Sequence, residues 1–185
     1  MRKTPRRNPV AFPRLPARPP RSEAFKRWFG QSKVVDERGK PLIVFHGSNN
    51  PFYTFKYDFW GKTDPGFAGK GFYFTSDFPW AEFYAEDGSG PNDTPTVTAV
   101  YLRMENPLIV QHYNAIPDAP KRVPTKAEAE RMQQSLISLG YDGIIIPGHP
   151  TEFVVFRPNQ IKSVMNTGTW KDENQDIRYN PLNHY

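Results

Sequence analysis

Cysteine is absent from the 185 residues of this sequence, which excludes a disulfide framework, a thiolate metal site and a cysteine nucleophile. The four histidines do not follow the spacing of metal ligands, so we expect no metal. No apolar run approaches the roughly 18 residues that a membrane-spanning helix needs. The basic start of the chain also lacks the apolar segment of a secretory signal. These absences favour a cytoplasmic protein without a membrane partner.

Acidic residues are missing from residues 1–22, which carry seven Lys or Arg and six prolines. Prolines prevent a helix and favour an extended, solvated chain. Without these seven, the chain's 24 basic residues fall to 17 against 19 acidic ones, so residues 23–185 carry a net charge of −2. We therefore predict a basic, flexible arm (1–22) on a single domain (23–185). Such an arm suits nucleic acid or an acidic partner, and a solubilising tail is the alternative.

Short β-prone runs outnumber helical ones in the rest of the chain. They are the two runs of "SKVVDERGKPLIVFHGS", joined by a turn at 36–39, then "TVTAVYLRM", "YDGIII", "EFVVF" and "QIKSVM". An aromatic content of 15% is enough for a packed core. This order of elements predicts an α+β fold with a largely antiparallel sheet and few helices.

Three helices carry recognisable start signals. Ser22 can cap a short helix that Gly30 ends, and Pro79 suits the first turn of a second one. Thr125 and Glu128 form a capping-box pattern for a helix at about 126–139. Its predicted apolar face is Ala129, Met132, Leu136 and Leu139, and Gly140 stops it. Residues 49–70 and 111–124 have no periodicity, and we predict loops there.

Three motifs contain residues able to carry chemistry. In "FHGS", His46 leaves a strand and is followed by a glycine, whose bare backbone can approach a ligand. "GKGFYFTSDFPWAEFYA" places Tyr73 and Tyr84 eleven residues apart, and "TEFVVF" places Glu152 at the head of a strand. Each motif has a structural alternative: a hydrogen-bonded core histidine, two packed core aromatics, and an exposed carboxylate.

In this order, the three motifs resemble the ADP-ribosyltransferase family. The resemblance is to its His-Tyr-Glu branch, which contains the poly(ADP-ribose) polymerases and diphtheria-type toxins. The flanking text is similar to ADP-ribosyltransferase domains of phage and mobile-element polyvalent proteins, and the resemblance covers about residues 23–180. The matching flanks are "FKRWFGQSKVVDERGKPLIVFHGS", "GYDGIII", "RPNQIKSVMNTGTW" and "DIRYN". The resemblance implies the split, largely antiparallel sheet of that family and NAD as the ADP-ribose donor.

The resemblance also implies how NAD would be held. Tyr73 and Tyr84 would sandwich the nicotinamide, because flat aromatic faces attract a flat, cationic ring. His46 would hold a ribose hydroxyl, and the backbone of Gly47 would pair with the carboxamide. The remaining residues implied at the NAD site are Ser48 near the adenosine ribose and Gly71 in the tyrosine motif. The loop 49–70 would cover the adenosine and pyrophosphate, with its Lys62 and Lys70 as candidate phosphate partners.

Glu152 would be the catalytic residue, with His46 and Tyr73 beside it. Breaking the bond between nicotinamide and ribose passes through an oxocarbenium-like ribose, as in glycoside hydrolysis. A carboxylate bonded to the ribose 2′-hydroxyl stabilises charge that exists mainly in the transition state. Because nicotinamide leaves as a neutral molecule, it needs no general acid, and one glutamate is enough.

Two positions depart from the family pattern. Ala81 stands where the polymerases carry a serine that binds the carboxamide, which weakens the expected hold on nicotinamide. Pro150 stands where arginine-modifying toxins carry a second glutamate, so we do not expect arginine as the acceptor. The stretch "GFAGKG" has the wrong glycine spacing and context for a dinucleotide-binding fingerprint, and we reject a Rossmann fold.

Three functions follow from these patterns. The first is a mono-ADP-ribosyltransferase, a pentosyl-transferring glycosyltransferase that modifies a protein or nucleic acid. If phage-derived, it would be an effector in the cytoplasm of a bacterial host. The second is an inactive NAD- or ADP-ribose-binding module of the same fold. The third is a nucleic-acid-binding protein, which we rank last because the near-neutral body lacks interleaved basic and aromatic residues.

Overall fold

The computed structural model describes residues 9–178 except 12, 61–65, 167 and 169. Its helices are α1 (Glu23–Phe29), α2 (Phe78–Glu86) and α3 (Lys126–Ser138), with short 3₁₀ turns η1 (Tyr57–Phe59), η2 (Tyr113–Ala115) and η3 (Pro158–Gln160). The strands are β1 (Val44–Ser48), β2 (Phe72–Thr75), β3 (Thr96–Leu102), β4 (Pro107–Ile109), β5 (Gly143–Ile146), β6 (Glu152–Val155) and β7 (Ile161–Ser163). This is the predicted α+β fold.

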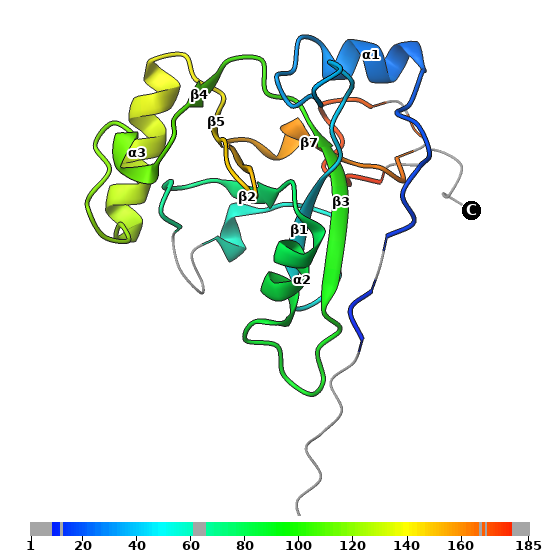
Figure 1. The fold of residues 1–185 in the computed structure, drawn as a ribbon, viewed down its shortest axis with the longest axis horizontal. Helices are drawn as coiled ribbons and strands as arrows, with labels where there is room; N and C mark the ends of the chain where they lie inside the picture. The colour runs from blue at the N-terminus through cyan, green and yellow to red at the C-terminus, as the bar shows by residue number, and fades with distance from the viewer. Residues whose placement is uncertain (1–8, 12, 61–65, 167, 169, 179–185) are drawn as a thin grey trace, which may run out of the picture.

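The strands form one sheet in the order β4-β5-β6-β2-β1-β3-β7, and every neighbouring pair except β4–β5 is antiparallel. In Figure 1, α3 lies beside β4 and β5, α1 lies at the opposite end, and α2 covers β1. Among the described residues, β1 and β2 register a single pair, Phe45 with Thr75. On their other sides both strands are paired along their whole length. The sheet therefore consists of two halves that meet at a narrow seam between β1 and β2.

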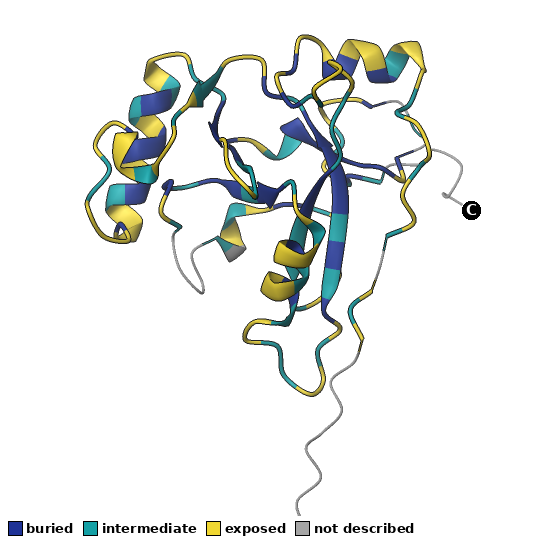
Figure 2. Ribbon diagram, in the orientation of Figure 1, coloured by how far each residue is buried: buried dark blue, intermediate teal, exposed yellow. Residues whose placement is uncertain are grey.

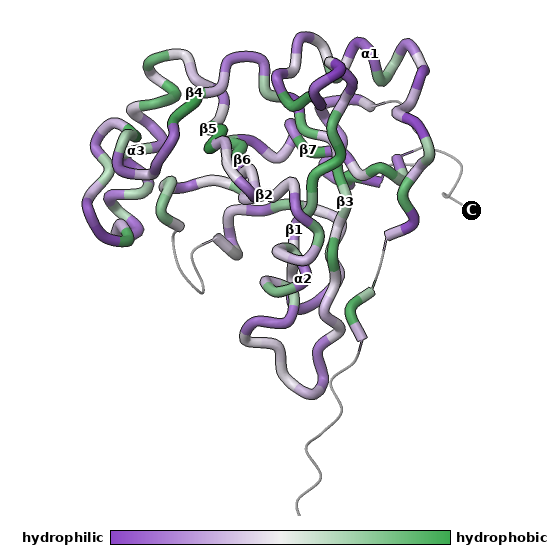
Figure 3. Tube along the Cα trace, viewed as in Figure 1, coloured by the Kyte–Doolittle hydropathy of each residue, from purple (hydrophilic) through white to green (hydrophobic). Residues whose placement is uncertain are grey.

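Side chains alternate between the two faces of the sheet and fill three hydrophobic clusters. On one face, Phe45 and Tyr101 pack with α1, while Val154 and Ile144 pack under α3. On the other face, Phe74 and Phe153 pack with Phe55. The same cluster contains Val44, Val100, Leu102 and Ile177. Figures 2 and 3 show buried and hydrophobic residues concentrated on the strands, and Figure 2 shows exposed residues on the outer sides of the helices.

The helix signals of the sequence are confirmed, with one correction. The N–H of Phe25 donates to Ser22 Oγ at 3.2 Å, and Thr125 and Glu128 form the capping box of α3. Leu139, however, lies after the last helical residue and is 62% exposed, so its assignment to the buried face was wrong. Gln133 is buried in the helix instead. Its polar side chain can be buried because Nε2 donates to the hydroxyl of Tyr57 at 2.7 Å.

The predicted pair of β-runs before His46 is shorter than expected. The turn forms, with the N–H of Gly39 donating to the Asp36 carbonyl at 2.9 Å. It closes on an isolated bridge between Val35 and Pro41 instead of a strand pair. Leu42 still donates to the Val34 carbonyl at 3.1 Å, and pairing stops beyond it because the N–H of Lys33 donates to the Met104 carbonyl at 2.6 Å. The short strand β4 was not predicted, since three residues carry no measurable periodicity.

Part of the predicted arm lies against the domain. Ala11 bridges Thr96 of β3 in parallel; its N–H donates to the Pro95 carbonyl at 2.9 Å, and its carbonyl accepts from the N–H of Val97 at 3.3 Å. Val10 packs against the cluster that contains α1. Residues 1–8 and 12 lie outside the described residues. The domain boundary at residue 23 stays a prediction, but the arm is anchored at residues 10 and 11.

Candidate active site

His46 lies at the seam of the sheet. Beyond the pair of Phe45 with Thr75 the strands separate, and the imidazole bridges the gap with Nδ1 2.8 Å from the carbonyl oxygen of Tyr73. A carbonyl oxygen can only accept, so Nδ1 carries the hydrogen and Nε2 is the acceptor of this ring. The sequence motif thus produces a histidine with a defined tautomer at the opening of the sheet.

The surroundings of His46 keep the ring neutral. The rings of Phe52, Phe55 and Phe74 lie 5.6, 5.1 and 5.5 Å from it, centroid to centroid. Burial among them lowers the pKa of His46, and the smaller effect of the bond to Tyr73 opposes this shift. At neutral pH the imidazole is therefore uncharged, with Nε2 able to accept a hydrogen bond from a hydroxyl.

Gly47 allows α2 to lie directly on β1. A Cβ at this position would collide with the carbonyl oxygen of Ala81 and would lie 2.7 Å from the backbone nitrogen of Ala85. The backbone groups of a strand alternate in direction, so Gly47 turns its N–H and C=O the same way as Phe45, toward β2. Past the last registered pair, these two groups face the seam. Ala81, the departure from the family pattern, is a buried residue of α2 and is 1% exposed.

Tyr73 and Tyr84 differ in their packing: Tyr73 packs against the cluster under α3, whereas Tyr84 does not belong to any of the three clusters. Tyr73 is half-buried and its hydroxyl donates to the carbonyl of Gly69 at 2.6 Å. Gly66, which has φ +74°, lies so close that a Cβ there would collide with the Tyr73 ring. Tyr84 lies on the outer side of α2 and is 53% exposed. An aromatic that a folded chain leaves half in water contributes little to the core, so the exposure of Tyr84 argues against the packing alternative.

Glu152 is the first residue of β6 and is half-buried. It pairs with Thr75 of β2, and Tyr73 pairs with Val154 two residues further along β6. Residues opposite one another in an antiparallel pair share a face, so Tyr73 and Glu152 lie on the same face, the one that α2 covers. The ring of His46 packs against the cluster on the opposite face. It therefore reaches the seam from the side of the sheet that faces away from Tyr73 and Glu152.

Tyr113 holds the Glu152 carboxylate and was not found from the sequence. Its hydroxyl donates to Glu152 Oε2 at 2.5 Å, and its ring lies 5.3 Å from that of Phe67. Burial, and then the hydrogen bond to Glu152, raise the pKa of Tyr113, and the nearby Tyr84 adds to this effect. Tyr113 therefore stays a neutral donor. It comes from η2, inside a segment predicted to be irregular, and no local pattern marks it.

Three further predicted site residues, Ser48, Gly71 and Lys70, contact their neighbours in the structure. Ser48 Oγ donates to the carbonyl of Asn50 at 2.8 Å. A Cβ on Gly71 would collide with Val154 Cγ1, so this glycine lets β2 start against β6. Lys70 pairs with Glu130 at 2.7 Å and lies 4.8 Å above the Tyr57 ring. Lys62 lies outside the described residues.

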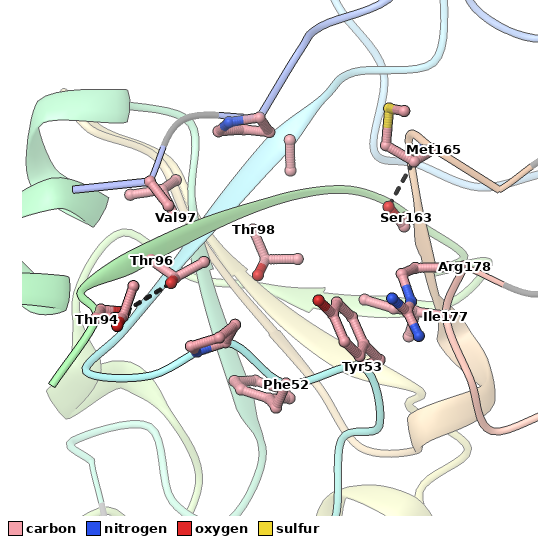
Figure 4. Close-up of a pocket in the computed structure, with 14 residues that line it drawn as sticks. Phe52, Tyr53, Thr94, Thr96, Val97, Thr98, Ser163, Met165, Ile177 and Arg178 are labelled. Carbon is pink, nitrogen blue, oxygen red and sulfur yellow. Dashed lines mark hydrogen bonds between the residues drawn. The ribbon is translucent and has the colours of Figure 1, made fainter. Parts of the chain in front are cut away.

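A separate hollow of about 270 Å³ lies at the edge of β3. Figure 4 shows Thr96 and Thr98 on one side of it and Tyr53, Ile177 and Arg178 on the other. The guanidinium carbon of Arg178 lies 3.0 Å from the centroid of the Tyr53 ring. None of the site residues predicted from the sequence lines this hollow.

Within the described residues, no group of three or more His, Cys, Asp or Glu side chains is placed to hold a metal ion. No helix among them is long and apolar enough to cross a membrane. Comparison with curated proteins and with solved structures gives no match. A family model described as ADP-ribosyltransferase in polyvalent proteins matches residues 36–171, which include His46, Tyr73, Tyr84 and Glu152. The chain therefore belongs to the ADP-ribosyltransferase family of polyvalent proteins.

Proposed function

We propose that this chain is an active mono-ADP-ribosyltransferase that uses NAD as donor and modifies a macromolecule. The observation that carries the proposal is the arrangement around Glu152. Its carboxylate lies on the same face as Tyr73, next to the seam that His46 and Gly47 border, and a phenol fixes one of its two oxygens. An exposed carboxylate without a role would not need such support.

NAD would lie across the seam. The nicotinamide enters between Tyr73 and the half-exposed Tyr84, and the N–H and C=O of Gly47 pair with its carboxamide. Nε2 of His46 accepts a hydrogen bond from a ribose hydroxyl, which requires the neutral tautomer fixed by Tyr73. Ser48 lies on the adenosine side. Family membership supports this assignment of NAD.

In the reaction, the bond between nicotinamide N1 and ribose C1′ breaks, and its electron pair leaves with the neutral nicotinamide. Glu152 accepts a hydrogen bond from the ribose 2′-hydroxyl and stabilises the positive charge that develops on the ribose. A hydroxyl or amine of the acceptor then forms the new bond to C1′ and releases one proton to solvent, whereas a carboxylate forms this bond without releasing a proton. Water in place of the acceptor gives plain NAD hydrolysis.

Incubation of the full chain with NAD labelled in its adenylate, with and without bacterial lysate, tests the proposal. Free nicotinamide is measured by chromatography, and label is measured on protein and on nucleic acid. We expect nicotinamide release and label on macromolecules. NAD binding without nicotinamide release would instead identify an inactive NAD-binding module and overturn the proposal.

A further inference from the structure

The hydrogen bond between Tyr113 and Glu152 links a residue outside the family motifs to the candidate catalytic carboxylate. A carboxylate on a flexible side chain has several rotamers, and only one directs an oxygen toward a given ribose hydroxyl. The Tyr113 hydroxyl fixes Oε2, while the ring is held by Phe67 and by the turn of η2. This leaves Oε1 with a defined direction.

We propose that Tyr113 is a positioning residue that orients Glu152 for the ribose 2′-hydroxyl, an inference that rests on the proposed function. The Tyr113 hydroxyl is the donor in its hydrogen bond to Oε2. The other oxygen, Oε1, therefore stays available to accept a hydrogen bond from the ribose 2′-hydroxyl. Tyr113 makes no bond to the reacting atoms, so its effect on the rate passes through Glu152. Holding a catalytic group in the productive geometry raises turnover with little effect on substrate affinity.

Tyr57 offers a matched control for a purely structural role. Its hydroxyl donates to the carbonyl of Phe156 at 2.6 Å and accepts from Gln133, and its ring stacks on Phe72 at 4.6 Å. Tyr57→Phe therefore also removes one hydrogen-bonded hydroxyl from a packed site, and the hydrogen bonds and ring contact of this side chain involve neither Glu152 nor Tyr113. A loss of stability alone would affect both variants alike.

Nicotinamide release by Tyr113→Phe, Tyr57→Phe and wild type tests this role. We expect Tyr113→Phe to lower kcat about 10- to 100-fold, with KM for NAD within about threefold. Tyr57→Phe should keep kcat.

In the Glu152→Gln background, Tyr113→Phe should change the rate by less than about twofold, because the two residues act as one unit. Unchanged kcat in Tyr113→Phe, or a full additional loss in the double variant, would overturn the inference while the proposed function stands. A wild type without nicotinamide release would overturn both.

A second observation concerns the outer face of α2, beside the same site. Trp80, Phe83 and Tyr84 are 42%, 55% and 53% exposed, and their rings pack on one another at 5.6–5.8 Å. Figure 2 shows this face of α2 as exposed. Contiguous exposed aromatics mark interaction surfaces. Tyr84 lies near enough to Tyr113 to raise the pKa of its hydroxyl, and that hydroxyl donates to Glu152.

This aromatic face is bordered by negative charge. Residues 71–102 contain five acidic residues and no Lys, Arg or His, in a chain whose net charge is +5. Glu82 and Glu86 lie next to the aromatic rings on α2, and Asp87 caps its end. Among the described residues, none of these three carboxylates forms an ion pair. Such a surface repels phosphates and attracts cationic side chains, which also bind aromatic faces.

We infer that α2 receives the acceptor and that the acceptor is a Lys- or Arg-rich protein segment, an inference that also rests on the proposed function. The test uses two synthetic peptides with the same Ser, Glu and Asp acceptors, one of high positive and one of high negative net charge, and a single-stranded oligonucleotide. Transfer of labelled ADP-ribose and release of nicotinamide are measured separately for wild type, Glu82→Lys/Glu86→Lys and Trp80→Ala/Phe83→Ala.

We expect label on the cationic peptide, a fall of about tenfold or more in both double variants, and unchanged nicotinamide release without acceptor. Label on the oligonucleotide or on the anionic peptide would overturn the inference. So would equal transfer by the variants, or NAD hydrolysis without transfer to any of the three probes. Absence of nicotinamide release would contradict the proposed function itself.

Discussion

At the scale of single residues, the candidate site depends on side chains whose polar atoms have defined partners. His46 has one tautomer because the backbone carbonyl of Tyr73 can only accept, and one oxygen of Glu152 is fixed because the hydroxyl of Tyr113 donates to it. Both partners come from elements far apart in the sequence, so the chemistry of each motif residue is set by the fold around it.

The lowered pKa of His46 gives a pH prediction. In the unfolded chain the imidazole takes up a proton near pH 6.5, whereas the folded chain favours the neutral ring. The stability that wild type gains from a neutral His46 is therefore complete above about pH 6.5 and is lost as the pH falls below it. We expect the difference in unfolding free energy between wild type and His46→Gln to shrink from pH 7.5 to pH 5.5 in denaturant titrations. A constant difference would contradict the neutral assignment.

Tyr84→Ala separates ligand binding from packing. Since the side chain is 53% exposed, its loss should leave the melting temperature nearly unchanged. Affinity for NAD, measured by calorimetry, should fall by about 1–2 kcal/mol as one aromatic wall is removed. Val154→Ala, a fully buried position under α3, should show the opposite pattern at about 2 kcal/mol of stability. A destabilised Tyr84→Ala with unchanged affinity would favour the packing interpretation.

At the scale of elements, the site is built where β1 and β2 separate and where α2 lies directly on Gly47. Gly47→Ala should push α2 off β1, because the new methyl group collides with the Ala81 carbonyl. We expect a loss of about 1–3 kcal/mol of stability, together with weaker NAD binding as Tyr84 moves. Gly90→Ala is the control, since its nearest neighbour would be Asp93 Oδ2 at 3.4 Å. Equal melting temperatures for Gly47→Ala and wild type would contradict this account of α2.

Some of the helices and strands could be predicted from the sequence, and others could not. Local signals predicted α1, α3 and most strands, because Ser22, Thr125 and Glu128 cap their own helices and because apolar runs mark β3, β5 and β6. The motif residues were found through their resemblance to a family. Tyr113 was not, because its bond to Glu152 joins residues 39 positions apart and leaves no periodic trace. The end of α3 before Leu139 and the three-residue β4 also lacked a local signal.

At the scale of the whole molecule, the arm and the domain are attached to each other. Deleting residues 1–8 removes four Lys or Arg and should leave both stability and nicotinamide release unchanged. Deleting residues 1–22 also removes the bridge of Ala11 to β3 and the packing of Val10, at about 1–3 kcal/mol for the two backbone hydrogen bonds. Thermal unfolding of both deletions checks this. Equal melting temperatures would mean that the anchored part of the arm does not contribute to the stability of the domain.

The central claim is that Glu152 stabilises charge on the ribose of NAD, and Glu152→Gln tests it most directly. Gln keeps the shape of the side chain and can still accept from Tyr113, but it lacks the negative charge. Nicotinamide release and NAD affinity are measured on wild type and variant under the same conditions. We predict that affinity stays within about threefold, whereas turnover falls by at least about 100-fold, the loss of a transition-state contact of roughly 3 kcal/mol. Equal turnover by Glu152→Gln and wild type would contradict the account.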